Sequence, residues 1–265
     1  MFKIFQRLWQ VNWAEQWQYR ANLIMYLLYW LISPIIYLAV WTSIASSKGS
    51  VNGLTVNDFT TYYMTLLIVD QITSNIVIYS FGYKIQDGTL SGELVRPIHP
   101  MLTNALVNNI AFKALTIMGF IPVWIILYFL YKPDFSSVTM TGILLSIPAM
   151  IIGFFVGFLL SASITSLAFW TTRVYSIHEF YYALALLFSG QFVPLTLMPP
   201  VIQEIAQFLP FQLQIYFPVQ LILGNLSETQ IIQGFASGVI WLVTSIVLFN
   251  VIWRNGVKRF SAVGA

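Results

Sequence analysis

Residues 139–169 read TMTGILLSIPAMIIGFFVGFLLSASITSLAF, and this stretch contains no charged side chain. Its length exceeds the roughly 20 apolar residues that an α-helix needs to cross a hydrocarbon core of about 30 Å. The stretch therefore predicts a transmembrane helix that is long enough to tilt or to project beyond the membrane. Five further segments are also long and apolar, so we expect six transmembrane helices. The predicted spans are 21–45, 59–80, 104–131, 139–169, 177–195 and 231–253.

The composition of the whole chain agrees with a membrane protein. Hydrophobic residues make up 58% and charged residues 8% of the chain, and the mean hydropathy is +0.78. Soluble domains carry about 25% charged residues, so lipid must be the solvent for most of this chain. The absence of cysteine excludes disulfides, thiolate catalysis and thiolate metal sites. We expect an all-α integral membrane protein with a single transmembrane domain over residues 1–265.

Two segments outside the predicted spans are too apolar for solvated loops. Residues 1–20 place aromatic side chains three or four positions apart, which predicts an amphipathic helix lying in the membrane interface. Residues 196–230 are also apolar, but their four prolines break any helix that would cross the membrane. There we expect short external re-entrant helices, whose backbone must be satisfied by protein or by a watery cavity.

The basic residues predict the orientation, because cytoplasmic loops carry an excess of Lys and Arg. With the N-terminus in the cytoplasm, only Lys48 and Lys132 of the 12 basic residues fall outside, and Lys113 lies near the inner end of the third span. Both termini are therefore predicted to be cytoplasmic. The segment 83–103 then becomes a cytoplasmic loop.

The sequence contains no recognisable catalytic or metal-binding constellation. No phosphate-cradling G-x-x-x-x-G-K-[ST] loop is present, so no nucleotide site is expected. His99 and His178 are far apart and lack the spacing of metal ligands. We predict no catalytic residue, no metal and no cofactor bound by this chain.

The cytoplasmic loop contains the most informative motif. Residues 88–100 read GTLSGELVRPIHP, so that two glycines and two prolines bracket a short amphipathic element. Glu93 and Arg96 are three apart and can share a helical face. Taken alone, the pattern is equally typical of a capped turn and of a charged docking feature for a partner.

The motif G-x-L-x-x-x-L-x-R-P from Gly88 through Pro97, the six spans and the re-entrant segment resemble a permease subunit of the type-2 ABC transporter family. The resemblance covers essentially the whole chain. In that family the loop is a coupling helix that sits in a groove of a separate ATPase subunit. The resemblance therefore implies a role in ATPase coupling for Gly88, Leu90, Gly92, Glu93, Leu94, Arg96 and Pro97.

The same resemblance implies the partners and the location. Two ATPase subunits would bind ATP and Mg, and a second permease subunit, identical or paralogous, would complete the pathway. The complex would lie in the inner (plasma) membrane, in contact with lipid, and no nucleic acid is expected as a partner.

Polar residues within the predicted spans indicate a substrate pathway, because exposing them to lipid is costly. Asp70 lies near several aromatic residues in the sequence, namely Tyr62, Tyr63, Tyr79 and Phe81. An acid in such surroundings suits a cationic aromatic substrate through charge and cation–π attraction. We expect export of a drug-like organic cation, a lipid or a glycolipid by alternating access. The alternative is a carrier or channel driven by an ion gradient without an ATPase. The candidate pathway residues are Asp70, Gln71, Ser74, Asn75 and Gln191.

Overall fold

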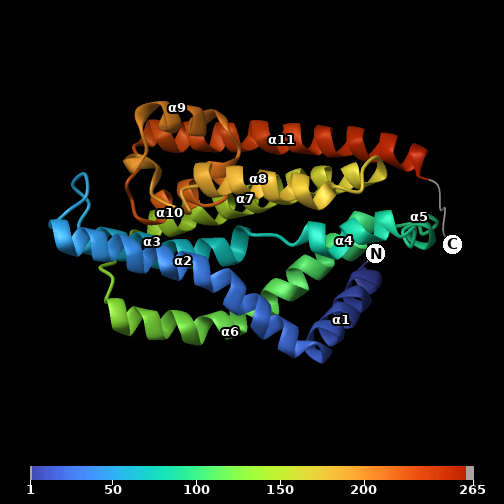
Figure 1. Cartoon of the computed structure of the whole chain (residues 1–265), viewed down its shortest axis with the longest axis horizontal. Coiled ribbons are helices and arrows are strands. Elements are labelled where there is room, and N and C mark those ends of the chain that lie inside the picture. The colour runs from blue at the N-terminus through green and yellow to red at the C-terminus, as the bar shows by residue number, and fades with distance from the viewer. Residues whose placement is uncertain (1, 261–265) are drawn as a thin grey trace.

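The structure is a computed structural model that describes residues 2–260, and the regular elements in this range are helical. Two of the longest helices, α7 and α11, pack against each other, and α2 packs against α3 (Figure 1). The α-helices are α1 (Phe2–Gln18), α2 (Arg20–Lys48), α3 (Val56–Thr73), α4 (Val77–Gln86), α5 (Ser91–Leu94), α6 (Val107–Tyr131), α7 (Met140–Ser166), α8 (Val174–Phe188), α9 (Pro200–Phe208), α10 (Tyr216–Ile222) and α11 (Glu228–Arg259).

Five helical segments within residues 2–260 are long and apolar enough to cross a membrane. The sequence predicts one further span over 177–195, the fifth in chain order, but the α-helix there is α8, which has only 15 residues. At about 1.5 Å per residue, such a helix is shorter than a hydrocarbon core of about 30 Å. This further span therefore stays a prediction. The five segments are Ile24–Lys48, Val56–Gln86, Val107–Tyr131, Met140–Phe169 and Glu228–Arg259.

The ends of the helices gather at two opposite ends of the molecule. α5, α1 and the last turns of α11 lie toward one end, whereas α10 and the loops that follow α2 and α6 lie toward the other (Figure 1). This arrangement agrees with the predicted clustering of the basic residues on one side. Which end faces the cytoplasm stays a prediction.

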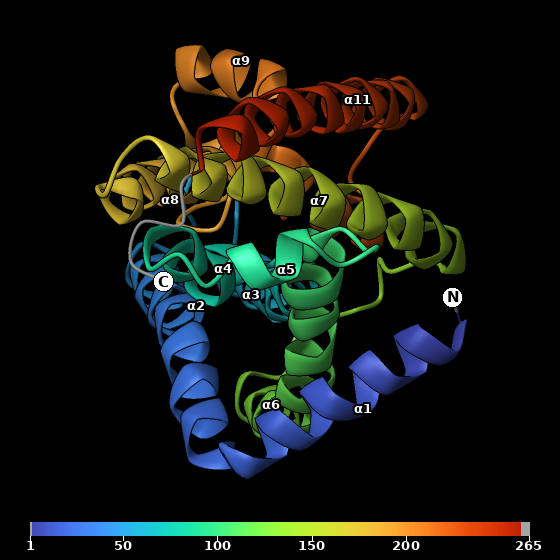
Figure 2. The same ribbon diagram turned by 90° about the vertical axis from the view of Figure 1, so that its right-hand side faces the viewer.

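The N-terminal segment forms a helix, as the sequence predicts. α1 lies crosswise to the long helices and crosses the beginning of α6 (Figure 2). Trp13 packs against the buried side chains of Phe112 and Leu115, and the Gln16 amide donates a hydrogen bond to Asn108 Oδ1 at 3.4 Å. The position of this helix in the membrane interface stays a prediction.

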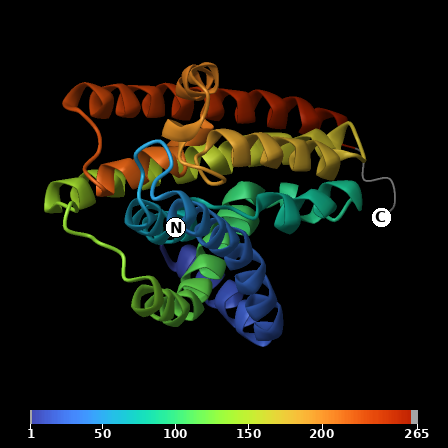
Figure 3. The ribbon, with the colours of Figure 1, turned by 60° about the vertical axis from the view of Figure 1, so that its left-hand side comes forward.

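The segment before the last span forms the short helices that its prolines predict. α10 packs against α7 and α3 and is largely buried. Gly142 of α7 permits this close approach, because a Cβ there would clash with the backbone oxygen of Leu221. Gly153 of α7 does the same for the turn before α10, where a Cβ would clash with the backbone oxygen of Leu213. α9 lies beside α11 (Figure 3), where the Trp241 indole donates to the Phe208 carbonyl at 3.0 Å. Whether these helices re-enter the membrane stays a prediction.

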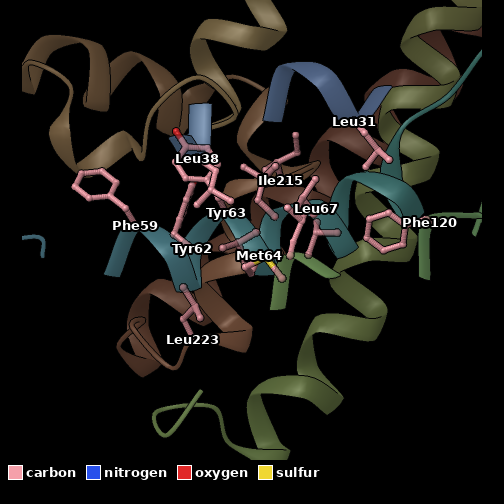
Figure 4. Close-up of a cluster of buried hydrophobic side chains, with 14 of the residues drawn as sticks. Leu31, Leu38, Phe59, Tyr62, Tyr63, Met64, Leu67, Phe120, Ile215 and Leu223 are labelled. Carbon is pink, nitrogen blue, oxygen red and sulfur yellow. The ribbon is translucent and has the colours of Figure 1, made fainter. Parts of the chain in front are cut away.

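The second apolar segment takes part in two separate hydrophobic cores. Its first half, α3, supplies Phe59, Tyr63 and Leu67 to a core shared with α2, α6 and α10 (Figure 4). Its second half, α4, supplies Phe81 and other side chains to a core shared with α7 and α11. The boundary between the two cores falls at a break in the helix.

Candidate functional site

The second predicted span is a discontinuous helix. α3 ends at Thr73, Ser74 is extended with φ −61° and ψ 161°, and α4 begins at Val77. The sequence predicts one segment over 59–80, and no Pro or Gly marks the break. Ser and Asn side chains compete with the backbone for hydrogen bonds, so Ser74 and Asn75 weaken the helix at this point.

Lys113 of α6 satisfies the polar groups that the break exposes. Its Nζ donates to the Gln71 carbonyl oxygen at 2.8 Å and to Ser74 Oγ at 3.0 Å. The ammonium also lies 5.8 Å from the centroid of the Phe154 ring. A cation at the carboxyl end of a helix interacts favourably with its unpaired carbonyls and its dipole. The sequence places Lys113 near the inner end of the third span, but gives no sign of this contact between two helices.

A cavity of about 270 Å³ lies beside the break. Its walls come from α2, from both sides of the break, from α8 and from the segment that follows α8. Aromatic side chains form much of the lining: Tyr26, Tyr29, Trp30, Tyr79, Tyr181 and Tyr182.

Two carboxylates lie in this aromatic lining. Asp70 is 8% exposed, and among residues 2–260 its carboxylate receives no hydrogen bond. Glu179 of α8 is exposed, and its carboxylate accepts a hydrogen bond from the Tyr79 hydroxyl at 3.3 Å. A buried carboxylate needs compensating donors or positive charge. Lys113 supplies part of that compensation, because its positive charge interacts with the Asp70 carboxylate.

The structure brings most of the predicted pathway residues together. Asp70, Ser74, Asn75 and Gln191 all line the cavity. Gln71 lies instead in a small neighbouring pocket that also contains Lys113, across the break. Passage of a substrate along these residues stays a prediction.

The aromatic neighbours predicted for Asp70 were largely wrong. Tyr62, Tyr63 and Phe81 are buried in the two hydrophobic cores, and only Tyr79 of that set lines the cavity. The hydroxyls of Tyr62 and Tyr63 donate to the backbone oxygens of Gly190 and Phe192, each at 2.8 Å. The aromatic lining comes instead mainly from α2 and α8, which are distant in the sequence.

The predicted coupling loop is anchored at its start and exposed at its tip. Gly88 has a φ of +82°, a left-handed conformation that glycine adopts without steric cost. Leu90 is fully buried in the core around Phe81, and Glu93 forms an ion pair of 2.8 Å with Lys84 of α4. Val95, at 84%, is far more exposed.

The remaining predicted coupling residues complete this picture. Leu94 packs partly against the same core as Leu90, whereas Gly92, Arg96 and Pro97 are exposed. Farther along, the His99 ring lies 4.8 Å from the Trp253 ring of α11, measured between centroids. Partial burial lowers the pKa of His99. The loop thus contacts α4 and α11, and its middle is exposed.

The folded chain does not assemble a metal centre in the part that the structure describes. No group of three or more His, Cys, Asp or Glu side chains gathers there.

Long apolar helices, a discontinuous span and a cavity lined by polar and aromatic groups define a multi-pass helical membrane protein. The chain belongs to the ABC-2 family transporter proteins, because residues 21–264 match that family. It is therefore a transmembrane permease of the ABC transporter type. No curated protein matches the chain.

Proposed function

We propose that this permease exports a hydrophobic organic cation from the cytoplasm, driven by separate ATPase subunits. The observation that carries the choice of substrate is the buried Asp70 carboxylate, which receives no hydrogen bond in residues 2–260 and faces an aromatic cavity. Family membership supports the transporter class. The test described below also distinguishes transport of a lipid or glycolipid from transport of a cation.

The chemistry of the cavity favours a cation over a neutral or anionic molecule. Its lining includes Asp70 and Glu179 but no Lys or Arg. A cation over the face of an aromatic ring gains about 0.5 to 2 kcal/mol, and the gain is greatest when water is excluded. An organic cation would satisfy the Asp70 charge and would bury its apolar groups against the tyrosine rings.

The loop over 88–100 would transmit the motion of the ATPases to this cavity. Leu90 and Phe81 share one core, and the Lys84–Glu93 ion pair ties the loop to α4. α4 begins directly after the break whose residues line the cavity. A push on the exposed middle of the loop would therefore move α4 and change the shape of the cavity, which is the alternating-access step.

A second permease subunit would cover the open side of the cavity. Tyr29 is 67% exposed, and Glu179 is exposed beside it on the same rim. A carboxylate between membrane helices is costly in lipid and normally faces protein or water. Pairing of two permeases through α2 and α8 would give each cavity a second wall.

We also propose six spans, with α8 and the segment after it completing the fifth crossing. The plasma membrane is the expected location, with both termini in the cytoplasm. The gathering of Arg96, Arg254 and Lys258 near one end supports this orientation, because basic residues are retained on the cytoplasmic side.

The test begins with purification of the chain from its native membrane and identification of every bound subunit. We expect an ATPase partner and ATP-dependent transport of an alkyltrimethylammonium amphiphile in proteoliposomes. Transport by the chain alone, without an ATPase, would instead identify a gradient-driven carrier or channel. Transport of lipid but not of the cation would reject the substrate and keep the transporter class.

A further inference from the structure

A second hollow lies at the end of the molecule that holds α5. It is a groove of about 490 Å³ between the segment 94–100 and the last turns of α11. Both segments lie at the same end of the molecule in Figure 1. The groove shares no lining residue with the cavity beside the break.

The groove combines a basic rim with an apolar floor. Arg254 and Lys258 are four residues apart on α11 and therefore share one face, and Arg96 comes from the other segment. All three side chains are exposed. Trp253 and Val257 are also four apart and supply apolar surface, together with Leu94. The lining includes no Asp or Glu, and the nearby Glu93 is paired with Lys84.

The capping of α11 accounts for only part of this charge. Basic residues in the last turn, such as Lys258, complement the carbonyl end of a helix. Arg96 belongs to a separate segment of the chain and has no such role for α11. The convergence of the three cations on one hollow therefore points to a ligand with negative charge.

The length of α11 places the groove at the level of lipid headgroups. This helix has 32 residues and, at about 1.5 Å per residue, is longer than a hydrocarbon core of about 30 Å. The apolar part of this helix is predicted to end at residue 253, so its last turns, with Arg254 and Lys258, extend beyond the core in that prediction. Basic pockets at this depth bind anionic headgroups, while acyl chains follow the apolar surface of the helix.

We propose that this groove binds an anionic glycerophospholipid. The phosphate contacts Arg96, Arg254 and Lys258, and the glycerol and upper acyl carbons lie against Trp253 and Val257. The bound lipid links the segment 94–100 to α11.

Native mass spectrometry tests this site with the full chain in neutral detergent. The protein is incubated with equal amounts of phosphatidylglycerol and phosphatidylcholine, and the retained lipid is identified. Wild type should retain phosphatidylglycerol preferentially. The double variant R254Q/K258Q should bind it roughly 30-fold more weakly, since each basic residue near an anionic surface contributes about a fivefold gain.

The control is K48Q/K132Q, which removes two exposed lysines at the opposite end of the molecule and should leave lipid retention unchanged. If the double variant does not fold, K258Q alone should weaken binding about fivefold. Equal retention of both lipids by wild type would overturn the proposal. The proposal would also fail if inorganic phosphate displaced the bound lipid as effectively as added phosphatidylglycerol does. It would fail as well if R254Q/K258Q still retained the lipid but no longer bound an ATPase partner.

Discussion

α3 and α4 come from one apolar stretch, yet they are held in the molecule in different ways. α3 is buried along most of its length in the core shared with α2, α6 and α10. Tyr62 and Tyr63 also tie it to the segment after α8 by hydrogen bonds. α4 is held by the other core, with the predicted coupling loop, α7 and α11. The break at 74–76 therefore separates two parts of the span that pack in different hydrophobic cores.

This difference assigns the break a role in the proposed transport mechanism. In the proposed mechanism, motion of the loop would be transmitted to α4 through the buried contacts around Phe81 and Leu90, whereas α3 would stay attached to its own core. The cavity lies where the two parts meet. A movement of α4 relative to α3 would therefore change the shape of the cavity.

The largest expected effects come from removing one aromatic side chain from each core. Phe81 and Phe59 are both fully buried, and Phe→Ala in a core costs about 3 to 5 kcal/mol of unfolding free energy. F81A should increase hydrogen exchange in α4 and the loop and spare α3. F59A should do the reverse. A uniform increase along both helices in either variant would show that the two cores are one unit.

A smaller effect is expected from removing the cation at the break. K113M leaves the Gln71 carbonyl without its donor and should lower the free energy of unfolding by about 2 kcal/mol, because charged hydrogen bonds are stronger than neutral ones. S74A removes only a hydroxyl and should cost about 1 kcal/mol. Chemical unfolding in mild detergent measures both. If K113M unfolded at the same denaturant concentration as wild type and the control K48M, the assigned role of Lys113 would be contradicted.

The ion pair between α4 and the loop should contribute less. The Lys84 and Glu93 side chains are only 20% and 13% exposed, so the cost of removing the two charges from water offsets most of their attraction, and we expect a net contribution of about 0 to 1 kcal/mol. A double-mutant cycle with K84Q and E93Q should give a coupling energy in that range and a smaller value at high salt. A coupling energy of several kcal/mol would mean that the ion pair, rather than the buried Leu90 side chain, holds the loop against α4.

The smallest effect is a pH dependence of the contact between the loop and α11. Burial lowers the pKa of His99, so the unfolded chain binds a proton more readily than the folded loop does. The stabilising contribution is therefore present above the ordinary imidazole pKa of about 6.5 and falls as the pH drops below it. Thermal unfolding of wild type should lose stability on acidification more steeply than that of H99N. If wild type and H99N lost stability equally as the pH falls, the pH dependence would not come from His99.

The sequence predicted the helical membrane fold because its signal lies in continuous apolar runs such as 139–169. It singled out Asp70 and Asn75, which line the cavity, because they stand out in apolar surroundings. It did not predict the break, since no Pro or Gly marks residues 74–76. Lys113, Tyr26 and Tyr182 were missed because their contacts join helices that are distant in the sequence.

The proposed function requires that the cavity at the break binds an organic cation through Asp70. The most direct measurement compares the binding of an alkyltrimethylammonium amphiphile with that of its uncharged tert-butyl isostere, in wild type and in D70N. Wild type should prefer the cation, and D70N should lose on the order of 100-fold in cation affinity while binding the isostere as before. Equal affinity of wild type for both compounds, or the same preference in D70N, would contradict the account.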